Sequence, residues 1–388
     1  MHIVFITQNY PPSVCGIGDH TYNLATTLAK RGYDIAVICH ENVYKNDSVV
    51  LYPIIKKWDK EGYQIALKKI DELQADWVFI QYEPYSFHAK GVPYLMPFFV
   101  RKLKNKGHKT LVFFHEIAVK WTFSSKLIAL SLAQRAIAQT MAFYAQHIVT
   151  SMAWYKKMLL PIFYKKIHIQ PIGSNIITAL QLGDTLKSNQ IQGDEFWIAC
   201  FGGDGVDKGY SILLDALKNL PFAKLLFIGK GENIKVYAQK NGLESQVVVT
   251  GILNTEGVYE NLQKCNVFAM VHVDIRGGIG FKSGSLAAGF YAGLPILGVK
   301  GAITETDKLI HRENCFLISE PKPENFEKAI VELYTDKILL QKLSENSKKY
   351  SDKYMSWRVF AEQFEQLLRL NTPTPKPKET VYSTPLSI

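Results

Sequence analysis

The sequence contains no apolar run of about 18 residues, the length that a membrane-spanning helix requires. Its longest apolar segment, residues 127–149, is interrupted by Gln134, Arg135 and His147, which favours a helix of a globular domain. The N-terminus has no basic segment followed by a long apolar one, so no signal peptide is predicted. From these absences we expect a cytoplasmic protein that does not cross a membrane.

Cysteine is scarce and no CxxC pair occurs among the five cysteines, which are widely spaced. This pattern argues against a disulfide framework and against a zinc site, and we expect buried, reduced thiols. The sequence also has no Asp-x-Asp pair, so it does not require a bound divalent ion. We therefore predict no metal and no cofactor.

Charge is distributed unevenly, although the overall composition of 47% hydrophobic and 21% charged residues is that of a globular protein. Residues 1–175 contain 21 Lys and Arg against 11 Asp and Glu, so the whole net charge of +10 lies in this half. A neutral second half argues against a uniformly basic nucleic-acid-binding protein. The asymmetry indicates two domains with different partners.

Short apolar runs rich in β-branched residues alternate with amphipathic segments, and this rhythm occurs twice. Such alternation predicts two α/β domains, each with a doubly wound (Rossmann-like) parallel sheet, facing each other across a cleft at the carboxyl ends of the strands. The expected strands are 2–7, 34–39, 77–81, 110–115, 147–150, 166–170, 196–201, 224–228, 246–250, 267–271, 295–298 and 315–318. The expected helices are 18–31, 60–73, 92–106, 124–144, 210–219, 234–241, 258–264, 283–292, 326–335 and 357–370.

We place the domain boundaries by composition. Residues 1–175 form the first domain and residues 176–355 the second, with a Gly-, Ser- and Asn-rich linker between them. The amphipathic helix at 356–370 follows, and residues 371–388 form a proline-rich tail that neither a helix nor a strand can accommodate.

Three glycine loops precede helices and could bind phosphate through backbone N–H groups. The first has Gly16 and Gly18, followed by Asp19, which could orient the loop, bind an acceptor or cap the helix. The second has Gly203 and a lysine suited to a phosphate oxygen, Lys208. The third is not a Walker A loop, but its side chains could converge on a diphosphate: Lys282, Ser283, Gly284 and Ser285.

At these loops the sequence resembles a GT-B-fold glycosyltransferase, most closely the retaining glycosyltransferase family 4. The motifs match in order over residues 1–370. The matching segments are the glycine loop at 16–18, His115 at a strand end, the hinge at 171–175, the Gly202 to Gly209 loop, the Gly229 loop, the base-reading segment with Gly251 and Leu253, the segment 293–295 and the Trp357 helix.

Two positions depart from the family pattern. The Glu-x7-Glu motif is absent, and the third loop resembles a variant with a basic-Gly-Ser loop, in which Gly280 and Phe281 precede Lys282 and Asp274 is the nearest carboxylate. Gly203 stands where the family has an arginine that binds the diphosphate, and Arg276 or Lys282 could replace it.

The resemblance implies transfer of a hexose from a nucleotide diphosphate sugar, such as UDP-glucose, with retention of the anomeric configuration. The acceptor would be a saccharide or lipid-linked saccharide in cell-envelope or exopolysaccharide synthesis, and no metal would be needed. His115, Lys208 and Lys282 would be catalytic. The donor would contact Gly16, Gly18, Asp19, Gly203, Lys208, Gly229, Gly251, Leu253, Asp274, Gly280, Phe281, Lys282, Ser283, Gly284 and Ser285.

The basic first domain would bind the acceptor. Its basic segments 101–106 and 156–166 are interleaved with aromatic residues, which suits an anionic membrane or a lipid-pyrophosphate-linked acceptor. We therefore expect peripheral contact with the inner face of the cell membrane, the alternative being solvated helix faces with a few buried rings. The aromatic residues in question are Trp121, Phe123, Trp154, Tyr155, Phe163 and Tyr164.

Other functions are compatible with the same residues. A sugar-nucleotide epimerase or a phosphorylase could use this fold, and the missing glutamates leave room for a nucleotide-sugar-binding protein without catalytic activity. A nucleic-acid-binding protein is disfavoured, because no basic run matches a known module.

Overall fold

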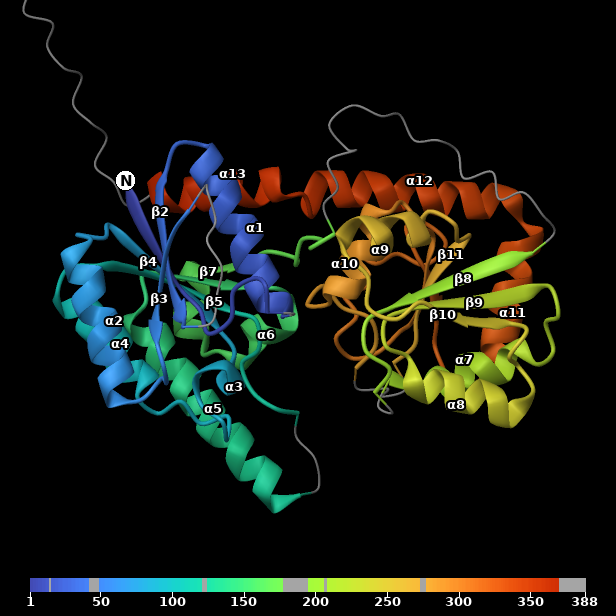
Figure 1. Cartoon of the computed structure of the whole chain (residues 1–388), viewed down its shortest axis with the longest axis horizontal. Helices are drawn as coiled ribbons and strands as arrows, with labels where there is room; N and C mark the ends of the chain where they lie inside the picture. The colour runs from blue at the N-terminus through green and yellow to red at the C-terminus, as the bar shows by residue number, and fades with distance from the viewer. Residues whose placement is uncertain are drawn as a thin grey trace, which may run out of the picture.

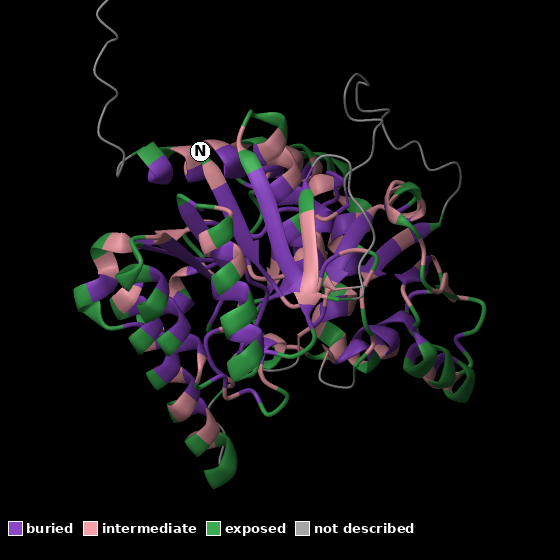
Figure 2. Cartoon of the chain, turned by 60° about the vertical axis from the view of Figure 1, so that its left-hand side comes forward, coloured by how far each residue is buried: buried purple, intermediate pink, exposed green. Residues whose placement is uncertain are grey.

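The computed structural model describes residues 1–13, 15–41, 49–120, 124–176, 195–205, 208–272 and 277–369. It shows two α/β domains side by side, with a pair of long helices running along one side of both (Figure 1). In each domain the central strands are buried and one edge strand is partly exposed, whereas the outer faces of the helices are exposed (Figure 2). Most of the predicted linker at 171–192 lies outside the described residues, as does the proline-rich tail.

The first domain contains a seven-stranded parallel sheet in the order β3-β2-β1-β4-β5-β6-β7. The strand that sequence reasoning missed is the edge strand β3, where half-exposed residues and Pro53 weaken the apolar signal. The strands are β1 (His2–Ile6), β2 (Asp34–His40), β3 (Val50–Ile55), β4 (Trp77–Tyr82), β5 (Lys109–Phe114), β6 (His147–Thr150) and β7 (Ile167–Ile169).

The second domain has the same architecture, with a six-stranded parallel sheet in the order β10-β9-β8-β11-β12-β13. Its strands are β8 (Phe196–Phe201), β9 (Ala223–Ile228), β10 (Val247–Val249), β11 (Val267–Met270), β12 (Ile296–Val299) and β13 (Phe316–Ile318). The strand order reverses between β1 and β4 in one sheet and between β8 and β11 in the other. Ligands of doubly wound sheets bind at such switch points, beyond the carboxyl ends of the strands.

The helices cover both faces of each sheet. Those of the first domain are α1 (Gly16–Lys30), α2 (Lys60–Glu72), α3 (Pro84–Phe87), α4 (Met96–Asn105), α5 (Ser125–Tyr144), α6 (Ala153–Met158) and the 3-10 helix η1 (Pro161–Lys166). Those that follow are α7 (Tyr210–Leu217), α8 (Glu232–Asn241), α9 (Thr255–Leu262), α10 (Gly284–Tyr291), α11 (Pro323–Thr335), α12 (Lys337–Tyr354) and α13 (Trp357–Arg369).

The structure differs from the sequence-based expectation at α1 and α12, and the short helices α3 and α6 were not predicted either. Helix α1 begins at Gly16, so Gly16 and Gly18 belong to its first turn and not to a preceding loop. Helix α12 was not predicted, because two of its buried positions are Ser347 and Ser351, which hide the apolar period set by Leu339 and Leu343. No helix in the described part of the chain is both long enough and apolar enough to span a membrane.

Helix α13 returns to the first domain and completes its core, as Figure 1 shows. Its apolar face, which includes Trp357 and Phe364, packs in one cluster with residues of β1, α1 and β4. The Trp357 indole Nε1–H donates a hydrogen bond to the Ser174 carbonyl at 2.7 Å. A Cβ on Gly173 would lie 3.2 Å from the Trp357 ring, so the glycine permits this close approach. The interdomain crossing is therefore fixed by a packed tryptophan.

Candidate active site

A cavity of about 710 Å³ lies between the two domains at the carboxyl ends of the strands. The first domain contributes residues that directly follow β1, β4 and β5, and the second contributes the loop before α10. Both sheets thus present their switch-point edges to one cleft. Its lining residues are Gln8, Asn9, Cys15, Gly16, Ile17, Glu83, Tyr85, Ser86, His115, Glu116, Ile172, Asn175, Lys282 and Gly284.

The first turn of α1 forms one wall of the cleft. A Cβ on Gly18 would lie 3.1 Å from the Asn9 carbonyl oxygen, so glycine allows the helix to approach the end of β1. Asn175 of the hinge donates its side-chain N–H to the Gly16 carbonyl at 3.1 Å. The hinge and the helix start are thereby held together at the cavity.

The structure differs from the prediction for Cys15 and for one of the roles considered for Asp19. Cys15 occupies the N-cap position of α1 and lines the cavity, so it is not a buried thiol, whereas the other four cysteines are buried. Asp19 lies in the first helical turn, so the interpretation of Asp19 as a helix cap is wrong. Burial raises the pKa of the Asp19 carboxyl to about 6.

His115 projects from the end of β5 into the cavity. Its Nε2 lies 2.7 Å from Gln81 Oε1, which can only accept, so Nε2 carries the proton and Nδ1 is left as the acceptor. The ring stacks on Phe113 with centroids 4.4 Å apart and meets His20 edge-on. Burial holds the pKa of His115 well below its usual value, so the imidazole is neutral at physiological pH.

An ion pair crosses the cleft between the domains. Lys282 Nζ, in the loop before α10, lies 3.1 Å from Oε1 of Glu116, which follows His115. The buried Tyr155 hydroxyl is 3.5 Å from the same oxygen. Lys282 was predicted as a donor-binding cation, whereas Glu116 was not predicted to have any role.

The loop from Lys282 to Ser285 connects the cavity with the second glycine loop. The Ser283 hydroxyl accepts the Leu286 N–H at 3.2 Å and caps α10, so it is already engaged by the helix. Apart from the capped Leu286 N–H, the N–H groups that open the first turn of α10, at the cavity-lining Gly284, are not used by the helix ladder. This turn therefore has the partial positive charge that favours an anion.

The second and third glycine loops meet at Gly202. A Cβ placed on Gly202 would lie 3.1 Å from Ser285 Oγ and 3.7 Å from Lys208 Nζ, and one on Gly203 would lie 4.0 Å from Lys208 Nζ. Among the described residues no carboxylate lies within ion-pair distance of Lys208. Two lysines, a hydroxyl and a helix N-terminus are thus gathered from segments far apart in the sequence.

The glycines at the ends of β9 and β10 allow the loops to approach each other. Gly229 and Gly251 form an isolated bridge, and a Cβ on Gly229 would lie 2.2 Å from the Gly202 carbonyl oxygen. Gly229, at φ 146°, has a backbone conformation that strongly favours glycine. Leu253 packs against the core of the second domain beside this bridge.

Two of the predicted donor contacts are packing residues in the structure. The Phe281 side chain is fully buried and stacks on Tyr350 with centroids 5.5 Å apart, while its carbonyl accepts the Ile172 N–H of the hinge at 2.9 Å. A Cβ on Gly280 would lie 3.0 Å from the Ile303 side chain, so a larger residue here would require Ile303 to shift. Asp274 and Arg276 lie outside the described residues.

Several cleft residues were missed because they belong to no motif. Glu83 directly follows β4 and Glu116 is the second residue after β5, and this position was the only signal that could have identified them. Both Glu83 carboxylate oxygens accept backbone N–H groups of α3, from Tyr85 at 3.0 Å and from Ser86 at 2.8 Å. Glu83 therefore shapes the wall of the cleft as a helix cap.

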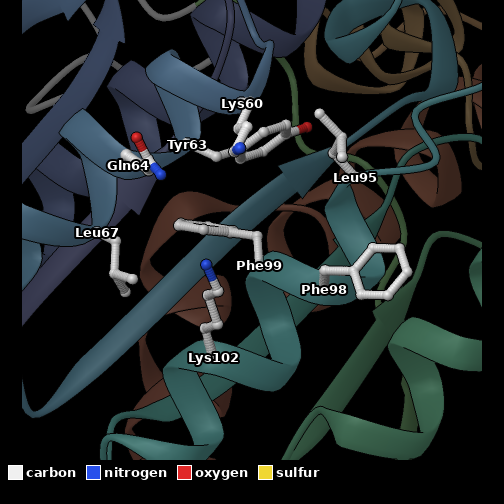
Figure 3. Close-up of a pocket in the computed structure, with 8 residues that line it drawn as sticks. All are labelled: Lys60, Tyr63, Gln64, Leu67, Leu95, Phe98, Phe99 and Lys102. Carbon is white, nitrogen blue, oxygen red and sulfur yellow. The ribbon is translucent and has the colours of Figure 1, made fainter.

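A second hollow lies on the outside of the first domain, between α2 and α4 (Figure 3). Its volume is about 80 Å³, and it is lined mainly by apolar groups, among them Tyr63, Leu67 and Phe99, with Lys60 and Lys102 at its margin. A small-ligand site usually measures about 300–1,000 Å³. The interdomain cleft is therefore the candidate active site.

In the described part of the first domain, no lysine or arginine lines this cleft. Arg101 and Lys104 lie near the C-terminal end of α4, where they contact the rings of Tyr144 and Phe143. These rings precede β6 and thus lie at the amino edge of the sheet, opposite the cleft. Of the predicted aromatic face, Tyr155 and Phe163 are buried, Trp154 is exposed, and Trp121 and Phe123 lie outside the described residues.

Comparisons with known families divide the chain in the same way as the structure. Residues 2–153 match the family model described as starch synthase catalytic domain, and residues 184–350 match the model described as glycosyl transferases group 1. No curated protein matches the sequence significantly.

Solved structures match the chain over nearly its whole length. Sucrose-phosphate synthase from Thermosynechococcus elongatus is 15% identical, with 95% of this chain and 98% of that chain covered and a TM-score of 0.71. HepE from Anabaena, solved in complex with UDP and glucose, is 14% identical, with 95% and 100% covered and a TM-score of 0.68. WaaG, a glycosyltransferase of lipopolysaccharide biosynthesis, is 17% identical, with 93% and 99% covered and a TM-score of 0.63. These matches confirm the predicted two-domain GT-B fold, and with the two family models they support a glycosyltransferase of the GT-B type.

Proposed function

We propose that the protein transfers a hexose from a nucleotide diphosphate sugar, with UDP-glucose as the first candidate, to a saccharide or lipid-linked saccharide acceptor. The observation that carries this proposal is the segment from Lys282 to Ser285. Lys282 and the N-terminus of α10 line the cleft, and Ser285 lies beside Gly202, where Lys208 also lies. The structure of HepE with UDP and glucose, on the same fold, makes UDP-glucose a reasonable first donor to test.

The main barrier in this reaction is the negative charge that develops on the leaving diphosphate. Fixed cations and unpaired N–H groups stabilise such charge because they are already oriented before the bond breaks. In our proposal, Lys208 and Ser285 contact one phosphate beside Gly202, while Lys282 and the first turn of α10 contact the other. No metal is needed in this arrangement.

His115 would bind the donor sugar as a neutral hydrogen-bond acceptor. Because Gln81 accepts the proton of Nε2, Nδ1 can accept a sugar hydroxyl proton. A neutral imidazole also avoids placing a positive charge beside the anomeric carbon, which becomes cationic in the transition state.

We propose retention by internal return on one face of the sugar. The bond between the anomeric carbon and the phosphate oxygen breaks as the acceptor oxygen forms its bond to the same carbon. The acceptor proton passes to the departing phosphate oxygen. The cleft would hold donor and acceptor on the same side of the sugar ring.

Contact with an anionic membrane remains our proposal for the basic surface of the first domain. Arg101 and Lys104 lie at the amino edge of the sheet, and the exposed side chain of Phe143 accompanies them. A surface of this kind would favour an acceptor in cell-envelope or exopolysaccharide synthesis.

The first experiment is a thermal-shift series with UDP, GDP, ADP and their glucose conjugates. A ligand well above its dissociation constant should raise the melting temperature by linkage. UDP release from UDP-glucose with saccharide acceptors then tests transfer, and NMR of the product's anomeric proton tests retention. Binding without UDP release in the presence of acceptors would instead support a nucleotide-sugar-binding protein.

A further inference from the structure

The ion pair between Lys282 and Glu116 crosses the interdomain cavity beside His115. Its two members come from different domains, and the Nζ–Oε1 distance is 3.1 Å. Their side chains are 34% and 39% exposed, so a ligand in the cavity can reach both groups. The pair therefore joins the two walls of the cleft through groups that a substrate can separate.

The two carboxylates of the described cleft wall differ in availability. Glu83 uses both oxygens to cap α3, with an additional hydrogen bond from the Ser86 hydroxyl at 2.9 Å. Glu116 has Lys282 and the distant Tyr155 hydroxyl as its hydrogen-bond partners. If Lys282 turned away, Glu116 would become an available acceptor beside His115.

A diphosphate should compete well for Lys282. It carries more negative charge than one carboxylate, and it also gains hydrogen bonds from the first turn of α10, which Glu116 does not contact in the structure. The exchange would replace a partly exposed ion pair, which is weak, by a phosphate contact supported by several donors. Donor binding should thus release the glutamate.

We propose that Glu116 holds Lys282 until the donor diphosphate takes the lysine, and that the released carboxylate then accepts a hydrogen bond from an acceptor hydroxyl. This inference rests on the proposed function and deepens it, because it makes Glu116 a specificity-determining residue. The group that enters beside Glu116 is an uncharged saccharide, since a phosphorylated sugar would meet a like charge there. Acceptor binding follows donor binding, because Lys282 occupies the carboxylate before the exchange.

The test is E116Q, studied by calorimetric titration with UDP and by kinetics with UDP-glucose and methyl glucoside. We expect UDP to bind about two- to five-fold tighter, because a partly exposed ion pair no longer competes for Lys282. We expect kcat/KM for the acceptor to fall about ten-fold or more, because the amide is a weaker acceptor. A residue with a merely structural role would weaken both steps, so the opposite signs are diagnostic.

Two further variants complete the experiment. In a Lys282→Ala background, Glu116→Gln should leave UDP affinity unchanged, because the competing pair is already gone. Glu72→Gln is the matched control, since it removes a carboxylate that pairs with lysines on the outer face of α2. Melting temperatures of all variants show whether they fold.

If folded E116Q bound UDP no more tightly than the parent, or if its acceptor kinetics were unchanged, this inference would be wrong. The proposed function would be unaffected by either result. A tightening of UDP binding by E116Q that persists in the Lys282→Ala background would also overturn the inference. If the parent chain binds none of UDP, GDP and ADP, both the proposed function and this inference are wrong.

Discussion

Gln81 Oε1 lies 2.7 Å from His115 Nε2, and this hydrogen bond fixes the orientation of the imidazole from inside the sheet. Gln81 is fully buried in β4, on the neighbouring strand. A buried polar side chain with a partner of this kind is strongly constrained, because breaking the bond would leave both groups unsatisfied. The histidine is thus held in one tautomer, with Nδ1 directed away from Gln81.

Gln81→Leu should lower kcat/KM for the donor about ten-fold, because His115 loses its fixed tautomer and orientation. The ¹H–¹⁵N spectrum of the imidazole, which distinguishes the tautomers, should change as well. Gln81→Glu should partly restore activity and raise the pKa of His115, so that activity falls at acidic pH. Gln134→Leu alters another buried glutamine, bonded to Val119 and Gly91, and is the control. Loss of activity with an unaltered imidazole spectrum would contradict this positioning role.

Lys282→Ala should weaken UDP binding about ten-fold or more, because a charge-assisted contact to the diphosphate is lost. Calorimetry measures this effect directly. Lys102→Ala, at the hollow between α2 and α4, should leave the affinity unchanged. If Lys282→Ala bound UDP as well as the parent does, the loop before α10 would not be the diphosphate site.

Asp19→Asn should stabilise the protein at pH 7.5 by about 1 kcal/mol, discounted for partial exposure of the carboxyl. The folded-state pKa is raised to about 6 from 3.8, so the folded state binds the proton more tightly than the unfolded state does. The contribution of the Asp19 carboxyl to the free energy of unfolding is therefore most favourable below pH 4 and declines as the pH rises towards 6. Urea unfolding at pH 4 and pH 7.5 measures the difference, which should vanish at the lower pH. An equal gain at both pH values would show that ionisation of Asp19 is not the cause.

Trp357→Phe should destabilise the protein by about 1–3 kcal/mol, because the Ser174 carbonyl loses its buried indole donor. Denaturant unfolding followed by circular dichroism provides the measurement. The exposed Trp154 supplies the matched control, since Trp154→Phe should change stability little. Equal stability of the Trp357 and Trp154 variants would show that the hydrogen bond does not hold the crossing helix.

Much of the fold could be predicted from the sequence, because buried parallel strands and amphipathic helices have clear periodicities. The strand at 196–201, the helix beginning at Lys60 and the apolar stripe from Trp357 to Leu368 all follow from local pattern. Two of the elements that were not predicted, β3 and α12, also have local causes for their weak signal. The edge strand β3 is half exposed, and α12 buries serines, so neither shows a strong apolar contrast.

The sequence by itself determined two parallel-sheet domains, an amphipathic C-terminal helix and the glycine-rich segments at strand ends, since these depend on spacing along the chain. Only the tertiary structure decided which groups meet. Lys282 and Glu116 are 166 positions apart, and Gln81 and His115 are 34 apart, on neighbouring strands. Sequence spacing carries no information about such contacts, because each depends on strand order, on the crossing of α13 and on the closure of two independently packed cores around one cleft.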